Sequence, residues 1–337
     1  MYGRQANQVI SFAVEFRTIV ELPPSCIILG VRSRAVLVGS CFAGHIGQRL
    51  ADAMPEGRCA VNPSGVVYNP ESVASAVEMM MDGTEPLNDK YFTAADGSWR
   101  NWLCSGEYSA ETEAGCRRKI EENFNLHAAV LAKADVLFLT FSTDHGYYHH
   151  EGGFVVANCH KMPQRLFDER AIPYEQMLRK WDDLLGRIEC RWPGMKVVFT
   201  VSPYRYRKYG LTESQSSKAK LRVLIDSLIE RHSSAAYFPA YEILVDELRD
   251  YRFYAPDMLH PSEQAVDYVW ERFKEWAFSE ELADFARDKS LIVRDANHRL
   301  LHPDSVEARQ FEQKRRERLV AFQRKWGEAA GLPLADV

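Results

Sequence analysis

The sequence carries no surplus of positive charge. Its 337 residues include 42 lysines and arginines against 47 aspartates and glutamates, which gives a net charge of −5. No basic block stands clear of acidic neighbours, so the chain lacks the electrostatic footprint that binding to a phosphate backbone requires. We therefore expect no nucleic-acid partner.

Long apolar runs are also missing. The most apolar early stretch, residues 10–31, is interrupted by Glu15, Arg17, Glu21 and Pro23. A membrane-spanning helix needs about 20 predominantly apolar residues, and a secretory signal needs a basic start followed by an uninterrupted apolar core. We therefore expect no transmembrane helix and no membrane partner, and we predict a cytoplasmic protein.

Several familiar sequence signatures are absent. The seven cysteines are odd in number, widely spread and never arranged as C-x-x-C, so reduced thiols are the simplest expectation. The P-loop, G-x-G-x-x-G, H-E-x-x-H and G-x-S-x-G patterns do not occur either. These absences argue against a nucleotide-binding enzyme, a common dehydrogenase, a zincin and a typical α/β-hydrolase.

What is present is a regular alternation of short apolar runs and helical patterns. The composition, 46% hydrophobic, is sufficient for a sizeable core. Strands are expected at residues 35–38, 59–61, 135–141, 196–201 and 236–239, and helices at 40–54, 71–81, 109–132, 173–189, 214–231 and 262–278. Apolar strands that alternate with helices predict a parallel sheet with helices on both faces. The predicted fold class is α/β, a three-layer doubly wound sandwich with helical additions at the C-terminus.

One enlarged domain is more consistent with this pattern than two. We predict a main domain at residues 35–280, an N-terminal extension at 1–34 and a C-terminal helical extension at 281–337. Residues 82–106 and 142–158 lack a clear period, so both are expected to form loops.

Ser40 is the first candidate for chemistry. It lies between a buried strand and a helix, where the positive end of the helix favours a developing oxyanion. Serine is also a preferred N-cap residue, so a purely structural role is the alternative. Cys41 is a second possible nucleophile, although we expect it to face the sheet as a small buried hydrophobic residue.

Asp257 and His260 form the second candidate, in a short segment bounded by Pro256 and Pro261. A carboxylate three residues before a histidine can orient one ring nitrogen and leave the other free to accept the proton of a serine. The alternative is that His260 only caps the following helix. Gly65 and Asn158 could supply oxyanion donors through a backbone amide and a side-chain amide, or could simply be turn residues.

Several segments of the chain resemble the GSCFA family, which is similar to the SGNH (GDSL-like) hydrolases. Residues 39–43 spell the signature GSCFA that names the family. Further blocks, in the expected order, are NPSGVVYNP at 62–70, VANCHK at 156–161, SP at 202–203, SKA at 217–219, YFPAYE at 237–242 and RDYRFYAPDMLHPS at 249–262.

This resemblance implies Ser40 as nucleophile, His260 as general base and Asp257 as the residue that orients it. It also implies oxyanion donors at the Ser40 amide, Gly65 and Asn158. The implied reaction is acyl transfer from a small ester, such as an acetylated sugar or metabolite, through an acyl-serine. Hydrolysis and O-acyl transfer remain alternatives, and neither needs a metal or an organic cofactor.

Two positions depart from the family pattern. Tyr206 stands near a position where the family tends to have a histidine, and Cys104 and Ser105 occupy another such place. With Tyr68, His145 and His160, Tyr206 is a candidate for substrate binding.

Two rival hypotheses remain. The histidine tract at 144–150, with His160, could bind a transition metal, but a loop over the pocket is the simpler interpretation. A catalytically inert module that binds a carbohydrate or acyl ligand is the second rival. The oligomeric state stays open.

Overall fold

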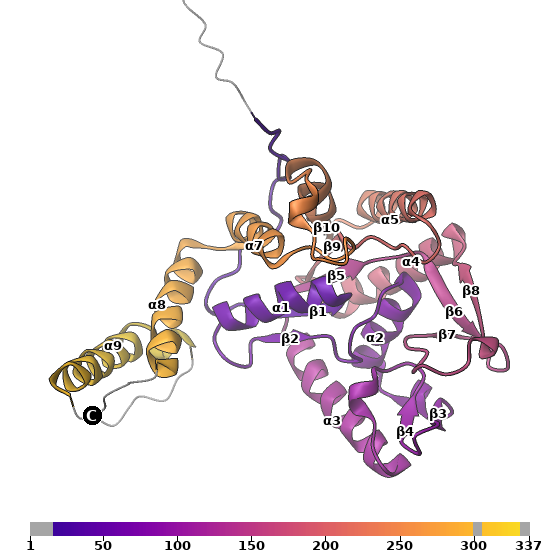
Figure 1. The fold of residues 1–337 in the computed structure, drawn as a ribbon, viewed down its shortest axis with the longest axis horizontal. Coiled ribbons are helices and arrows are strands. Elements are labelled where there is room, and N and C mark those ends of the chain that lie inside the picture. Colours follow the sequence, from indigo (N-terminus) through magenta and orange to yellow (C-terminus); the bar gives the residue numbers. More distant parts are fainter. Residues whose placement is uncertain (1–15, 299–304, 331–337) are drawn as a thin grey trace, which may run out of the picture.

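The computed structural model describes residues 16–298 and 305–330 (Figure 1). Within these ranges, none of the helices combines the length and the hydrophobicity needed to cross a lipid bilayer. Residues 1–15 of the predicted N-terminal extension, and residues 299–304 and 331–337 of the C-terminal one, lie outside the described part. The predicted domain boundaries stay predictions.

A five-stranded parallel sheet forms the centre of the molecule, in the order β10-β9-β5-β1-β2. Its strands are β1 (Ala35–Gly39), β2 (Cys59–Val61), β5 (Val136–Phe141), β9 (Lys196–Val201) and β10 (Ala235–Tyr237). Every residue of β1 and β5 is buried. This burial on both faces explains why the strands are continuous apolar runs in the sequence.

Alternate residues of each strand belong to two separate cores. Val36 and Val38 pack with helices α2 to α5, whereas Ala35 and Leu37 pack with helices on the other face. The first group comprises α2 (Pro70–Asp82), α3 (Glu113–Leu131), α4 (Tyr174–Arg191) and α5 (Leu211–Arg231), and the second includes α1 (Cys41–Ala53) and α7 (Glu263–Ala277). The three-layer α/β fold predicted from the sequence is confirmed (Figure 1).

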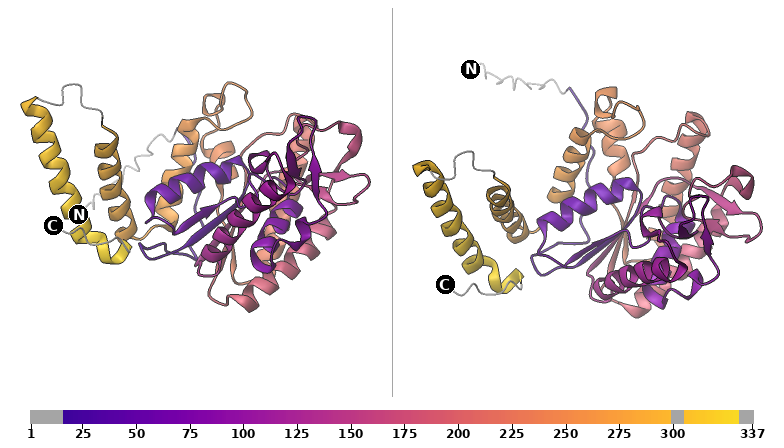
Figure 2. Two further views of the ribbon diagram at one scale, coloured as in Figure 1. Left: turned by 90° about the horizontal axis from the view of Figure 1, so that it is seen from below. Right: turned by 60° about the horizontal axis from the view of Figure 1, so that its bottom comes forward.

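Two helices follow the sandwich. Helix α8 (Glu280–Asn297) packs against α1, and α9 (Val306–Ala330) packs against α8 (Figure 2). Phe285 of α8 contacts Phe322 and Trp326 of α9, and these rings extend the core on the α1 side of the sheet. The predicted helical additions at the C-terminus are therefore present in the structure.

Two regions predicted as loops contain strands, and that prediction was wrong. Residues 82–106 include a hairpin of β3 (Tyr91–Thr93) and β4 (Trp99–Asn101). Strand β6 (His145–His149) pairs antiparallel with β7 (Val155–Val156) and β8 (Phe167–Ala171). Strands β3, β4, β6 and β8 are only partly buried and β7 has only two residues, so all five lack the long apolar run that marks the central strands.

The remaining elements are short. They are η1 (Glu85–Leu87), η2 (Gly106–Tyr108), η3 (Gln164–Leu166), α6 (Ala240–Glu242), η4 (Ile243–Glu247) and η5 (Tyr251–Phe253).

Candidate active site

The strand order reverses between β1 and β5, which are neighbours at the centre of the sheet. In open α/β sheets, ligands bind outside the carboxyl ends of the strands at such a switch point. Ser40 follows β1 directly, and Ser142 follows β5 directly. The fold therefore places the predicted nucleophile where a ligand site is expected.

Ser40 occupies the N-cap position of α1, but its side chain caps nothing. Its backbone is extended (φ −70°, ψ 177°), and its carbonyl accepts the amide of Gly44 at 3.1 Å. The Ser40 hydroxyl is fully buried and has no hydrogen-bond partner among the described residues. By contrast, Ser262 and Ser279 each accept a backbone amide at the start of α7 and α8. The capping alternative therefore does not explain Ser40.

The turn before Ser40 depends on Gly39. Its φ is +151°, and a Cβ atom at this position would lie 2.4 Å from the carbonyl oxygen of Thr140 on β5. The Gly39 amide donates to Oδ1 of Asn62 at 2.8 Å, which ties the end of β1 to the turn after β2. A side chain at residue 39 would push the two central strands apart, so the tight turn that presents Ser40 requires glycine.

Asp257 and His260 form the pair that their spacing predicts. His260 donates from Nδ1 to Oδ2 of Asp257 at 2.6 Å, and Oδ1 of Asp257 accepts the amides of Leu259 and His260. The hydrogen bond from His260, followed by these two amides, lowers the pKa of Asp257 to about 2. The carboxylate is therefore ionised at neutral pH and keeps Nδ1 protonated, which leaves Nε2 of His260 as a possible proton acceptor.

The loop that carries this pair is attached to the loop after β9. Arg205 donates its backbone amide to the carbonyl of Leu259 and its guanidinium to the carbonyl of Met258, both at 3.1 Å. The ring of Tyr204 lies 4.4 Å from that of His260. Both side chains of the pair are about half exposed, so the fold holds them at the surface of the site.

A cavity of about 410 Å³ opens beside the pair. It is lined mainly by aromatic and polar side chains: Cys41, Tyr68, Asn69, Thr143, His145, Tyr147, Val156, Ala157, Asn158, Cys159, Glu169, Tyr204, Tyr206, Lys208, Tyr209 and His260. The pocket thus reaches from His260 to the first residue of α1, next to Ser40. Its volume is that of a small-molecule site.

Cys41 differs from our expectation, because it is partly exposed and lines the pocket instead of facing the sheet. Burial raises the pKa of its thiol. A thiol with a raised pKa is a poor nucleophile at neutral pH, so Ser40 remains the better candidate.

The three predicted oxyanion donors stand in different situations. The amide of Ser40 has no backbone acceptor among the described residues. Asn158 lines the pocket, and its Oδ1 accepts the amide of His160 at 2.7 Å while Nδ2 has no described partner. The amide of Gly65 already donates to the carbonyl of Asn62 at 2.9 Å. To act as a donor, Gly65 would first have to break this turn.

Of the predicted substrate-binding residues, Tyr68, His145 and Tyr206 line the pocket. His160 lies in a separate depression that it shares with Asn158. Its Nε2 contacts the carbonyl of Asn101 at 2.9 Å, and burial lowers the pKa of its ring. These features are those of a structural histidine inside the fold.

Lys218 is a feature of the site to which the sequence assigned no role. Its side chain is buried, and Nζ donates to the carbonyls of Ser142 and Ser202 at the ends of β5 and β9. Burial lowers the pKa of this amine to about 7. The lysine joins two strand ends that border the site. The only signal was its place in the SKA block at 217–219.

The described residues offer no cluster of ligands for the metal ion that the histidine tract could bind. Within residues 16–298 and 305–330, no three histidine, cysteine or acidic side chains converge to hold an ion. In the histidine tract, His149 stacks on Phe154, and His150 pairs with Asp168.

The fold and the site define an α/β protein with an uncommitted serine at the switch point of a parallel sheet and an Asp–His pair beside the same pocket. Residues 34–273, most of the chain, match the model of the GSCFA family. The protein therefore belongs to the GSCFA family.

Two solved structures show a distant likeness. One, from Streptococcus pneumonia, is provisionally described as a platelet activating factor; it is 10% identical, and the match covers 72% of this chain and 84% of that one with a TM-score of 0.35. The other, from Parabacteroides merdae, is provisionally described as a GDSL-like lipase; it is 11% identical, and the match covers 75% and 98% with a TM-score of 0.35. No curated protein matches the chain. Likenesses this weak carry no conclusion about activity.

Proposed function

We propose that this protein is a serine hydrolase that cleaves a small ester through an acyl-Ser40 intermediate. One observation carries the proposal: a histidine oriented by an ionised carboxylate lines the same pocket as the helix start that follows an uncommitted, buried serine hydroxyl. A nucleophile, an oriented base and nearby amide donors are the parts that acyl transfer needs.

In the first half of the reaction, Nε2 of His260 takes the proton of Ser40 as Oγ forms a bond to the ester carbonyl carbon. The Ser40 amide and Nδ2 of Asn158 stabilise the oxyanion of the tetrahedral intermediate. The carbon–oxygen bond of the ester then breaks, and His260 gives its proton to the leaving alcohol. Asp257 remains ionised throughout and stabilises the imidazolium.

In the second half, water gives a proton to His260 and attacks the acyl carbon. The bond to Oγ of Ser40 breaks, Oγ regains the proton, and a carboxylic acid leaves. An O-acyltransferase would differ only here, because the hydroxyl of an acceptor would replace water. The observation that favours considering this alternative is a second histidine in the pocket, His145, which contacts the carboxylate of Asp144.

The proposal is tested by labelling with a fluorophosphonate probe, followed by peptide mass spectrometry. We expect an adduct on Ser40 in the wild-type protein and a strong loss of labelling in His260→Ala. His150→Ala is the matched control, because it removes the histidine of an Asp–His pair that does not line the pocket. A folded wild-type protein that stays unlabelled would contradict the proposal and favour the inert binding module.

A further inference from the structure

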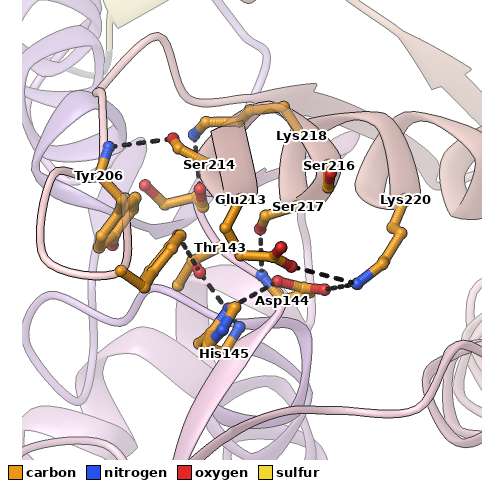
Figure 3. Close-up of polar contacts among 12 residues, drawn as sticks. Thr143, Asp144, His145, Tyr206, Glu213, Ser214, Ser216, Ser217, Lys218 and Lys220 are labelled. Atoms are coloured by element: carbon orange, nitrogen blue, oxygen red, sulfur yellow. Dashed lines mark hydrogen bonds and ion pairs between the residues drawn. The ribbon is translucent and has the colours of Figure 1, made fainter. Parts of the chain in front are cut away.

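A second Asp–His pair contributes its histidine to the pocket that His260 lines. Asp144 follows β5, and His145 is the first residue of β6. Nδ1 of His145 lies 2.9 Å from Oδ1 of Asp144 (Figure 3). The mechanism proposed above uses neither residue.

The carboxylate of Asp144 is completely buried. Its Oδ2 accepts a hydrogen bond from Lys220 at 3.0 Å, and the Asp144 amide donates to Oγ of Ser217 at 2.9 Å (Figure 3). Burial alone would raise the pKa of Asp144, but the hydrogen bonds with Ser217 and Lys220 hold it below the ordinary value. Since a buried charge is costly, this arrangement keeps an ionised carboxylate fixed against His145.

The ring of His145 is fixed as well. It stacks on Tyr209 with ring centroids 4.1 Å apart and planes 8° apart, and the Tyr209 hydroxyl is hydrogen-bonded to Oγ1 of Thr143 at 2.7 Å. Because an ionised Asp144 keeps the proton on Nδ1, Nε2 carries a lone pair. This nitrogen has no hydrogen-bond partner among the described residues and belongs to a side chain that lines the pocket. It is therefore a fixed acceptor for a hydroxyl group.

Other pocket residues suit the same kind of ligand. Lys208 lies 2.6 Å from Oε2 of Glu169 and is hydrogen-bonded to the hydroxyl of Tyr147. All three residues line the pocket. A wall of charged and hydroxyl groups, with aromatic rings on the same cavity, suits a polyhydroxylated ligand better than an alkyl chain.

We propose that the Asp144–His145 pair is a hydroxyl-binding site, and that the ester substrate therefore carries a polyhydroxylated, carbohydrate-like alcohol. This inference rests on the proposed function, because it assigns a substrate class to that site. His145 accepts a hydroxyl of the alcohol and so selects among esters. The competing interpretation is structural: the pair would only fasten β6 to α5.

The test compares p-nitrophenyl acetate, whose alcohol has no further hydroxyl, with 6-O-acetylglucose and monoacetylated xylobiose. We expect His145→Phe, which retains a ring against Tyr209, to lower kcat/KM for the sugar esters about tenfold more than for p-nitrophenyl acetate, chiefly by raising KM. His145→Gln, which retains an acceptor, should recover part of this difference. His150→Phe is the matched control and should change neither rate.

Equal losses for both kinds of ester in His145→Phe would overturn the inference in favour of a structural role. Unchanged rates for both would overturn it too, as would a wild-type enzyme that cleaves p-nitrophenyl acetate but neither sugar ester. Thermal unfolding of each variant establishes that it is folded. Failure of the proposed function is recognised separately, because it leaves wild-type Ser40 unlabelled by the fluorophosphonate.

Discussion

Two Asp–His pairs each contribute a histidine to the pocket, and they have similar contacts and different surroundings. The pair of Asp257 and His260 lies in a surface loop, with both side chains about half exposed. In the pair of Asp144 and His145, the carboxylate is completely buried and the histidine is only 12% exposed. The first pair can exchange protons with solvent and with a moving substrate, whereas the second is held rigidly by a lysine and a stacked tyrosine. Under the roles proposed above, the same Asp–His contact serves a base where the loop is exposed and a binding group where the carboxylate is buried.

Removal of the exposed histidine should have the largest effect. We expect His260→Ala to lower kcat for p-nitrophenyl acetate by about 10³-fold or more, because the base that activates Ser40 is lost. Steady-state kinetics measures the loss in kcat for His260→Ala, and the same measurement on His145→Ala serves as the comparison. A larger loss in His145→Ala than in His260→Ala would reverse the roles that we assign to the two pairs.

Loss of the charged partner of the buried pair should destabilise the protein more than loss of an exposed ion pair. Lys220→Met removes the charged partner of a fully buried carboxylate, and we expect it to lower the free energy of unfolding by about 2 kcal/mol, since Lys220 is itself partly exposed. Urea unfolding measures the change. The control is Arg249→Met, which breaks an exposed ion pair with Asp246 and should cost less than about 0.5 kcal/mol. Equal costs in the two variants would show that burial of Asp144 adds nothing.

The smallest expected effect is a change in stability at acidic pH, caused by protonation of Asp257 in the exposed pair. The pKa of Asp257 is about 2 in the folded protein and 3.8 ordinarily, so the unfolded chain binds the proton first as the pH falls. The stabilisation is therefore complete above about pH 4 and is lost as the pH approaches 2. We expect the melting temperatures of the wild type and Asp257→Asn to converge over this range. A difference between them that stays constant from pH 5 to the acid limit would contradict the assignment.

The sequence predicts the central sheet well because its strands are buried on both faces. Strands β1, β5 and β9 are short apolar runs in the sequence and lie close to the predicted positions. Strand β6 was missed because its residues are polar or aromatic and only partly buried. Its stability comes from pairing with β8, some twenty residues further along the chain, and such pairing leaves no local pattern.

The same reasoning explains which parts of the site could be predicted from the sequence. Asp257 and His260 are three positions apart in the sequence, so their contact could be inferred from spacing. The commitment of the Gly65 amide to a turn, and the positions of Lys218 and Asp144 inside the protein, depend on contacts between distant segments. Charged residues are expected at the surface, so composition gives no hint that these two are buried.

The position of β1 in the sheet also bears on how the protein is made. Ala35 of β1 is paired on one side with Cys59 of β2 and on the other with Val136 of β5. During synthesis, β1 therefore leaves the ribosome long before its second neighbour and carries an apolar, unpaired edge in the meantime. Such edges bind chaperones and other nascent chains. Among the strands with two neighbours, β1 is the one whose second partner lies furthest from it along the chain, so its unpaired edge persists longest during synthesis.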